Sequence, residues 1–593
     1  MNWYHLGLTA TIRLQKYNHQ KNKMAKGNKK GIGERNFDAI VIGSGISGGW
    51  AAKELTERGL RTLVLERGRD VKHVVDYPTT NLNPWELEHR GRVPLEITDE
   101  NPIVSRCYAF KEDTAHFFDK DKNHPYGQQK PFDWIKGYQV GGKSLTWARQ
   151  VQRWSDFDFE GPARDGFAVD WPIRYKDLAP WYSYVEKFAG ISGNKDGLDV
   201  LPDGEFLPPY ELTKVEKHFK EQLANHYSDR HLIIARCAHI SEPQPVHYEQ
   251  GRVQCQNRVL CQRGCPYGGY FSSNASTLPW AAKTGNLTLR ADAVVESLIY
   301  DEEKGKVTGV RVIDAHSQEV TEYFANIFFV NASAANTNLI LLNSTSTRFP
   351  NGLGNDNGLM GKYFAFHNYR ARIQAEYNGY LDFTTDGRRP TGGYIPRFRN
   401  VYRQETKFLR GYAAALSAFR GVDTNQEGWG HALKENLHKR ELGKWQVSSH
   451  MMGETIPKET NFISLDNNQT DAWGIPLLNF SVDYDSNDEM MIADYFEQIS
   501  DMLEKTGFTN IRTIDTKQAP GLDIHEMGGV RMGEDPATSL LNEWNQLHTC
   551  KNVFVTDGAC MTSTGTQNPS LTYMALTARA ADFAAKELKK GNL

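Results

Sequence analysis

The sequence lacks any run of 18 apolar residues, so it offers no segment long enough for a membrane-spanning helix. It also lacks an excess of either charge. A net charge of −3 over 593 residues gives no electrostatic basis for binding nucleic acid. Cysteine is scarce and odd in number, seven residues in all, which argues against a disulfide framework. What remains is the composition of an ordinary globular protein, long enough for two or more domains.

The first 35 residues differ in composition from the rest of the chain. They hold eight Lys or Arg residues against a single acid, Glu34, and we expect a basic disordered tail over residues 1–35. Met24 is an alternative start. No long apolar region, cleavage site or paired arginine indicates an export signal. The default expectation is a cytoplasmic protein, and the alternative is a periplasmic one carried across the membrane by a signal-bearing partner.

A dinucleotide-binding pattern follows the tail. Residues 37–42 are apolar and predict a buried strand, and a helical segment and a second strand ending at Glu66 come soon after. Between the first strand and the helix lies a turn of small residues, Gly43, Gly45, Ser47 and Gly48. Glycines there allow a tight turn and a close approach of the backbone to a pyrophosphate, which the helix N-terminus attracts. An acid 23 residues after the first glycine can bind a ribose. This pattern alone leaves NAD and FAD both open.

Two further motifs lie far from the first. Residues 136–149, KGYQVGGKSLTWAR, form a glycine-containing loop with Gly141, Gly142 and Ser144. The C-terminal region contains HEMGGVRMG from His525 and, after a buried strand, Asp557-Gly558. Asn568-Pro569 precedes a long helical segment and lies 43 residues after His525.

The three motifs together resemble those of the glucose-methanol-choline (GMC) oxidoreductase family in order and spacing. The resemblance implies FAD bound by the glycine turn, by the loop at Gly141 and by Asp557-Gly558. It implies that His525 acts as the catalytic base, that Asn568 binds the same substrate hydroxyl, and that hydride passes to flavin N5. Pro569 would mark the helix end that faces the flavin, and Val294 would be presented to the adenine.

One residue departs from a branch of that family. In the pyranose oxidases a His in the glycine loop bonds covalently to the flavin, and Thr146 occupies the matching position here. We therefore expect non-covalent FAD. His450 and His367 are kept as candidates for a role on the substrate side.

The resemblance also implies a discontinuous fold of the α/β class. A Rossmann-like FAD-binding domain is expected over residues 36–164, 251–369 and 520–593. An α+β substrate domain built on an antiparallel sheet is expected over residues 165–250 and 370–519.

Three cysteines cluster within the loop 255–266, at Cys255, Cys261 and Cys265, with Pro266 next. Thiolates are soft ligands that suit iron–sulfur clusters or zinc. The spacing is similar to that in the catalytic subunit of bacterial FAD-dependent glucose dehydrogenases, which implies a three-iron (3Fe–4S) cluster. Cys237 is an alternative outside ligand for a four-iron cluster. Structural cysteines and a zinc site remain the alternatives.

The whole chain is similar to the catalytic subunits of glucoside 3-dehydrogenases. This implies oxidation of a secondary sugar hydroxyl, C3 of a glucoside, with electrons passed through the iron–sulfur cluster to an external acceptor. A small partner subunit and a cytochrome or quinone acceptor are expected with it. The alternatives are a gluconate, polyol or other pyranose dehydrogenase or oxidase of the same family, and a non-catalytic flavoprotein that only transfers electrons.

Overall fold

The computed structural model describes residues 34–593, except residue 167 and the segments 385–388 and 424–427. Nearly all of the basic tail predicted for residues 1–35 therefore lies outside the described residues. Glu34 is within them and forms an ion pair with Arg61.

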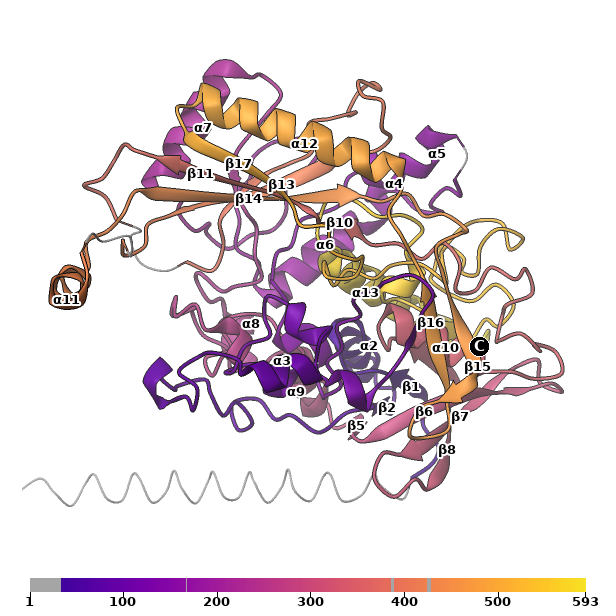
Figure 1. Cartoon of the computed structure of the whole chain (residues 1–593). Coiled ribbons are helices and arrows are strands. Elements are labelled where there is room, and N and C mark those ends of the chain that lie inside the picture. The colour runs from indigo at the N-terminus through magenta and orange to yellow at the C-terminus, as the bar shows by residue number, and fades with distance from the viewer. Residues whose placement is uncertain (1–33, 167, 385–388, 424–427) are drawn as a thin grey trace, which may run out of the picture.

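A five-stranded parallel sheet forms the lower half of the molecule in Figure 1, in the order β18-β9-β1-β2-β5. Its strands are β1 (Ala39–Ile42), β2 (Thr62–Leu65), β5 (Leu287–Arg290), β9 (Ile327–Val330) and β18 (Val553–Phe554). Every residue of β1, β2 and β9 is buried, as expected for parallel strands covered on both faces. Because β18 lies more than 500 residues after β1, the sheet is assembled from distant segments.

Helices cover this sheet: α2 (Ile46–Glu57), α9 (Thr277–Lys283), α10 (Ala334–Asn343) and α13 (Ser570–Lys590). Alanines form the contact between α2 and α13. Ala51 and Ala52 of α2 belong to the same core as Ala580, Ala581 and Ala584 of α13. Small side chains allow these two helices and the strands to approach closely. The discontinuous Rossmann-like part of the prediction is confirmed.

A seven-stranded antiparallel sheet forms the upper half of Figure 1, in the order β17-β11-β14-β13-β12-β4, with β10 paired to β14. Its strands are β4 (Ile233–Ile234), β10 (His367–Asn368), β11 (Ala371–Tyr377), β12 (Gly393–Ile395), β13 (Tyr412–Phe419), β14 (Trp445–Glu454) and β17 (Thr509–Asp515). Helices α7 (Lys214–His226) and α12 (Ser486–Lys505) cover its outer face and share a second core with it. The predicted antiparallel sheet is therefore also confirmed.

Two three-stranded sheets complete the fold. One contains β6 (Ala293–Asp301), β7 (Lys306–Asp314) and β8 (Val320–Phe324), and the other β3 (Gly127–Gln128), β15 (Phe462–Thr470) and β16 (Pro476–Ser481). The second sheet joins residues 462–481, expected in the substrate domain, to residues 127–128 of the expected FAD-binding domain.

Helix α6 (Tyr175–Ala189) was likewise expected in the substrate domain, yet Tyr182 contacts Thr572 of α13 at 2.8 Å between their hydroxyl oxygens. In both places the tertiary pairing crosses the boundaries drawn from the sequence. The division into domains otherwise stays a prediction.

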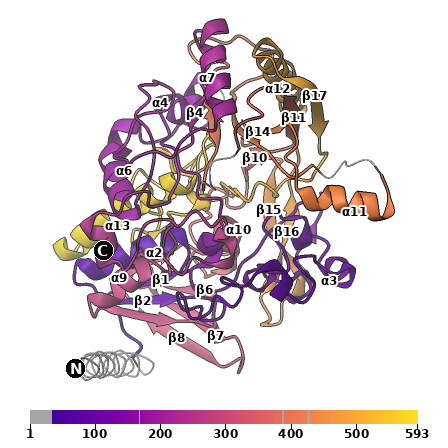
Figure 2. The ribbon, with the colours of Figure 1, turned by 90° about the vertical axis from the view of Figure 1, so that its left-hand side faces the viewer.

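The remaining helices are short: α3 (Leu95–Glu100), α4 (Asp156–Phe159), α5 (Gly161–Asp165), α8 (Pro245–Glu249) and α11 (Gly430–Lys439). Both views show α11 standing away from the body of the protein (Figures 1 and 2). Among the described residues, no helix combines the length and apolar character that crossing a membrane requires.

Candidate active site

One large cavity, of about 540 Å³, is lined both by the glycine turn after β1 and by residues of the antiparallel sheet. Tyr394 of β12, Ala415 of β13 and His450 of β14 contribute its sheet side. Its volume is in the usual range for small-molecule and cofactor sites. The cavity brings together motifs that are separated by hundreds of residues in the chain.

The glycine turn forms one wall of this cavity. Gly43, Gly45 and Ser47 line it, whereas Gly48 does not. A Cβ placed on Gly48 would lie 1.9 Å from the carbonyl oxygen of Gly43, so Gly48 allows the helix to pack against the turn. A Cβ on Gly45 would meet no protein atom within 4 Å. Gly45 thus leaves open the space that a bound pyrophosphate requires.

Glu66 is held at the end of β2 by a hydrogen-bond network. The Ser44 hydroxyl donates to its carboxylate at 2.5 Å, and the Gly68 N–H donates to it at 3.0 Å. Ser44 also accepts from the N–H of Gly141 at 2.9 Å, which ties the first glycine motif to the second. Burial is the main cause that raises the pKa of Glu66, and the hydrogen bonds from Ser44 oppose it.

The second loop contributes Gly142, Ser144 and Thr146 to the lining. Gly141 packs behind them, because a Cβ on it would lie 1.6 Å from the side-chain oxygen of Asn274. From the C-terminal motifs the lining includes Asp557, Gly558 and Asn568.

Two residues predicted to contact the cofactor lie beside the lining. Val294 is 1% exposed and packs in the core, while its neighbours Ala293 and Val295 line the cavity. This follows from the alternation of side chains along β6, so Val294 can reach the cavity only through its main chain. Pro569 is the N-cap of α13, and Ser570, the first residue of that helix, faces the cavity.

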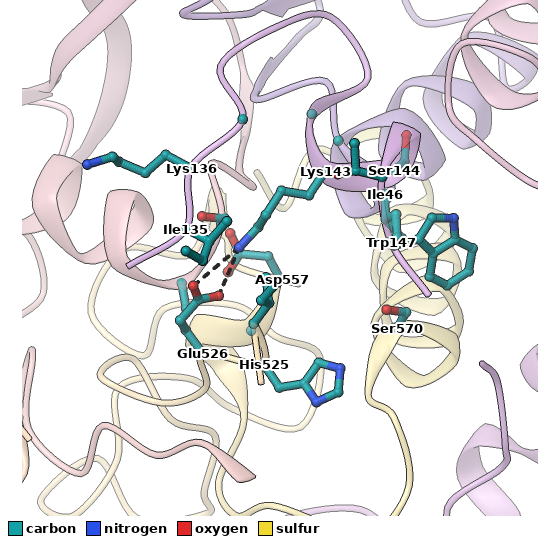
Figure 3. Close-up of a pocket in the computed structure, with 18 of the residues that line it drawn as sticks. Ile46, Ile135, Lys136, Lys143, Ser144, Trp147, His525, Glu526, Asp557 and Ser570 are labelled. Atoms are coloured by element: carbon teal, nitrogen blue, oxygen red, sulfur yellow. Dashed lines mark hydrogen bonds and ion pairs between the residues drawn. The ribbon is translucent and has the colours of Figure 1, made fainter. Parts of the chain in front are cut away.

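An ion pair that was not expected from the sequence lies inside the cavity. Figure 3 shows Lys143 reaching across to Glu526, with Nζ 3.0 Å from a carboxylate oxygen, and Asp557 lies beside them. Burial is the largest influence on the pKa of Asp557 and raises it to about 6, while Lys143 opposes that shift. In the sequence the only signals were that Lys143 lies inside the glycine loop and that Glu526 directly follows His525.

His525 and Asn568 converge in the same cavity. Nδ2 of Asn568 lies 3.3 Å from Nε2 of His525. Burial is the main cause that lowers the pKa of His525 well below its ordinary value, and His367 and Lys143 add to this effect. The imidazole is therefore neutral near pH 7, and a neutral imidazole can accept a proton.

His367 lies behind His525, away from the cavity lining. The two Nδ1 atoms are 2.9 Å apart, and Nε2 of His367 is 2.6 Å from the carbonyl oxygen of Gly565. His367 has no exposed surface, so the substrate-side role considered for it does not match its position. Sequence gave no signal for the contact because the two histidines are 158 residues apart.

His450 does line the cavity, at the end near the antiparallel sheet. It makes an edge-on contact with the Tyr369 ring, and burial lowers its pKa to about 3. Tyr394 and Gln150 line the same cavity. This wall therefore combines aromatic rings with neutral hydrogen-bonding groups, which suits a hydroxylated substrate.

The three clustered cysteines surround a separate small hollow. Cys255, Cys261 and Cys265 are free thiols that line it together with His239, whose Nε2 is 3.5 Å from Sγ of Cys261. Cys237 is fully buried and does not line the hollow. Gln262, between two of the cysteines, lines the large cavity, so this loop adjoins both spaces.

Comparisons with known proteins agree with this geometry. Models of the GMC oxidoreductase family match residues 38–367 and 457–577. The chain is 27% identical to the 2-methyl-1,2-propanediol dehydrogenase of Mycolicibacterium austroafricanum, over 93% of this chain and 95% of that protein. It is 25% identical to the fructose dehydrogenase large subunit of Gluconobacter japonicus, over 93% and 98% of the two chains. It is 25% identical to the paromamine 6'-oxidase of Streptomyces fradiae, over 94% and 92%.

The family models together cover well over half of the chain, and they include both the glycine turn and the segment that carries His525 and Asn568. The protein belongs to the GMC family of FAD-binding alcohol and sugar oxidoreductases.

Proposed function

We propose that the protein is an FAD-dependent dehydrogenase that oxidises a secondary hydroxyl of a sugar, at C3 of a glucoside or related pyranoside. The observation that carries the proposal is the meeting of His525 and Asn568, 3.3 Å apart, in the cavity that also contains the dinucleotide turn. A base and an amide donor at this spacing can bind one hydroxyl group together.

The residues of the chain have distinct roles in this reaction. His525 accepts the hydroxyl proton at Nε2, while the Asn568 side chain holds the hydroxyl oxygen. Bound FAD supplies the hydride acceptor, flavin N5. The N-terminus of α13 at Ser570 faces the same cavity, and its positive dipole end favours negative charge on the cofactor.

The residues present fit FAD. The Cβ of any larger residue at Gly45 would enter the cavity, Glu66 lies where a ribose is expected, and Thr146 offers no imidazole for a covalent link. Non-covalent binding is therefore part of the proposal.

The choice of a sugar is supported by the wall that contains Tyr369, Tyr394 and His450. The name of the fructose dehydrogenase relative also indicates a sugar substrate. A second candidate is a gluconate or polyol dehydrogenase, which the similarity to a gluconate 2-dehydrogenase flavoprotein from Pantoea cypripedii favours; that protein is 24% identical over 92% of both chains.

Anaerobic mixing with a substrate panel tests the proposal. Methyl glucoside, cellobiose, lactose, fructose and gluconate are each added to the FAD-loaded protein, and bleaching of the flavin absorbance is followed. Bleaching by a pyranoside, with the 3-keto sugar as product, is the expected result. Bleaching by gluconate alone would select the second candidate, and no bleaching by any compound would favour a non-catalytic electron-transfer flavoprotein.

The variant His525→Ala identifies the base. Its rate of flavin reduction should fall roughly 10²–10⁴-fold, because that is what a positioned base contributes. FAD content should stay at the wild-type level. A variant that reduces flavin as fast as the wild type would remove His525 from the reaction.

We also propose that the cysteine loop receives the electrons through an iron–sulfur cluster of the three-iron type. The donor set fits: three free thiols face one hollow, and two guanidinium nitrogens of the neighbouring Arg149 are buried without a hydrogen-bond partner among the described residues. Arg149 also lines the large cavity. Burial raises the pKa of the Cys261 thiol, and the cation Arg149 opposes that shift, so Arg149 is the neighbour that favours thiolate charge at this place.

The hollow itself has a volume of about 20 Å³, close to the space of one water molecule. A cluster therefore requires the loop 255–266 to open from its present conformation. Iron and acid-labile sulfide analysis of protein purified without oxygen decides between the alternatives. About three irons per chain would support the cluster, while zinc or no metal would refute it.

If the cluster is present, Cys261→Ser should spare flavin reduction and block electron transfer to an external cytochrome or quinone. A small partner subunit fits this arrangement, since the fructose dehydrogenase relative is named as a large subunit. Equal turnover with the external acceptor in wild type and variant would refute the relay.

A further inference from the structure

His367 is the buried histidine closest to the proposed base, and none of the functions given above uses it. Its side chain is completely buried, and both ring nitrogens lie at hydrogen-bond distance from a partner. One partner is the carbonyl oxygen of Gly565 and the other is Nδ1 of His525. In the contact between the two Nδ1 atoms, one histidine must therefore donate and the other must accept.

The roles can be assigned from the chemistry of the partners. A carbonyl oxygen only accepts, so Nε2 of His367 must carry the proton in its 2.6 Å contact with Gly565. His367 is neutral at pH 7, because burial lowers its pKa to about 4. In a neutral imidazole with a protonated Nε2, Nδ1 has a free lone pair. His367 thus accepts a hydrogen bond at Nδ1.

This acceptor fixes the state of His525. Its Nδ1 must donate to His367 across 2.9 Å, which leaves Nε2 of His525 without a proton. Nε2 is the atom that faces Asn568, whose amide donates to it at 3.3 Å. The chain of hydrogen bonds from Gly565 through His367 to His525 therefore places the Nε2 lone pair of His525 where the substrate hydroxyl is to bind.

We propose that His367 is a positioning residue that holds His525 in the tautomer with a free Nε2 and fixes the orientation of its ring. The inference rests on the proposed function of His525 as the base. His367 touches neither substrate nor cofactor and acts only through His525.

The backbone around His367 is anchored for such a role. Its N–H donates to the Asp523 carboxylate at 2.8 Å, and Asp523 is only two residues from His525. His367 also belongs to β10, where it pairs with Glu454 of β14. The ring is thus held from the antiparallel sheet, while His525 belongs to the C-terminal motif.

Two variants show whether His367 acts as a hydrogen-bond acceptor or only fills space in the core. His367→Leu fills space but cannot accept a hydrogen bond, whereas the side-chain oxygen of His367→Asn can. His247→Leu is the matched control: His247 is also fully buried and bonds to backbone groups of Gln244 and Lys187, but it does not line the cavity. Each variant is prepared as the FAD-loaded full chain and checked for flavin content and melting temperature.

The first readout needs no substrate. In protein labelled with ¹⁵N-histidine, the His525 signal, assigned by its absence in His525→Ala, should show a protonated Nδ1 and a bare Nε2. His367→Asn should keep that pattern and His367→Leu should lose it. A bare Nδ1 in the wild type, or an unchanged tautomer in His367→Leu, would overturn the inference whatever the protein's activity.

The second readout is the anaerobic rate of flavin reduction with the panel compound that bleaches the wild type. His367→Leu should lose about 10²-fold in the limiting rate with little change in the substrate concentration at half-saturation, because a wrong tautomer removes the base without removing binding. His367→Asn should recover most of the rate, and His247→Leu should match the wild type. If His525→Ala reduces flavin slowly while His367→Leu does so at the wild-type rate, His525 is still the base, but the proposed positioning role of His367 is wrong.

Discussion

At the scale of single residues, burial controls the chemistry of the site. His525 and His450 are both uncharged near pH 7 because the protein interior disfavours the imidazolium ion. Glu526 nevertheless stays close to a cation, Lys143, in the same cavity. The site therefore combines neutral imidazoles with one ion pair, and the neutral form of His525 is the form that can act as a base.

This predicts the acid limit of the reaction. Because the pKa of His525 in the folded protein lies well below 6.5, the base stays deprotonated as pH falls through 6.5. It loses its activity only when pH falls through the lowered pKa. The rate of flavin reduction at saturating substrate should therefore be flat from about pH 8 down to about pH 6.

Stopped-flow measurements across this range check the prediction. A rate that falls with an apparent pKa at or above the ordinary histidine value would contradict it.

At the scale of elements, the turn between β1 and α2 uses its glycines for different purposes. Gly48 permits contact between the helix and the turn, since a Cβ there would collide with the carbonyl oxygen of Gly43. Gly45 has φ −67°, a value open to any residue, and free space at its Cβ position. The fold requires glycine at position 48, whereas at position 45 we propose that glycine is required only by the cofactor.

The pair Gly45→Ala and Gly48→Ala tests this division. Gly45→Ala should fold with an unchanged melting temperature of the FAD-free protein but should bind FAD at least about 10-fold more weakly, since the methyl group enters the pyrophosphate space. Gly48→Ala should lower the stability of the FAD-free protein itself.

Fluorescence titration with FAD and thermal melts of the apoprotein provide the two measurements. Wild-type FAD affinity in Gly45→Ala would show that the pyrophosphate does not approach this turn.

At the scale of the whole molecule, a buried ionic network connects the antiparallel sheet to the loop that carries Asn568. Arg397 pairs with Glu454 at the end of β14 and with Asp158 of α4 at 3.2 Å. Asp158 also accepts a hydrogen bond from Gln567, the residue before Asn568, at 3.1 Å. The network therefore anchors the residue before Asn568 relative to the sheet.

Removal of the Arg397 cation should lower the free energy of unfolding. Arg397→Met leaves Asp158 and Glu454 buried without their main partner, and breaking a buried pair costs about 3–5 kcal/mol of unfolding free energy. Flavin reduction should slow as well, because the loop before Asn568 loses an anchor. The control is Arg403→Met, since the Arg403 side chain is 83% exposed and its pair with Glu405 should contribute about 1 kcal/mol or less.

Urea unfolding followed by far-ultraviolet circular dichroism and by flavin release measures both variants. Equal midpoints for Arg397→Met and wild type would show that the network does not stabilise the fold.

The sequence alone was sufficient to predict the elements whose conformation depends on residues adjacent in the chain. The first strand, the glycine turn, the helix and the second strand follow one another from residue 37 to Glu66. In the structure the two strands are β1 and β2, and the helix is α2. The alternation that turns Val294 into the core while Ala293 and Val295 face the cavity is also a local property of the strand.

The sequence by itself determined the motifs and hence the family, because each motif is a short run whose backbone conformation its own glycines, prolines and apolar residues dictate. Only the tertiary structure decided that β16 pairs with residues 127–128, that Lys143 meets Glu526, and that His367 lies against His525. These contacts join residues up to several hundred positions apart. Their free energy comes from burial and complementary hydrogen bonding in the folded chain, which no local pattern records.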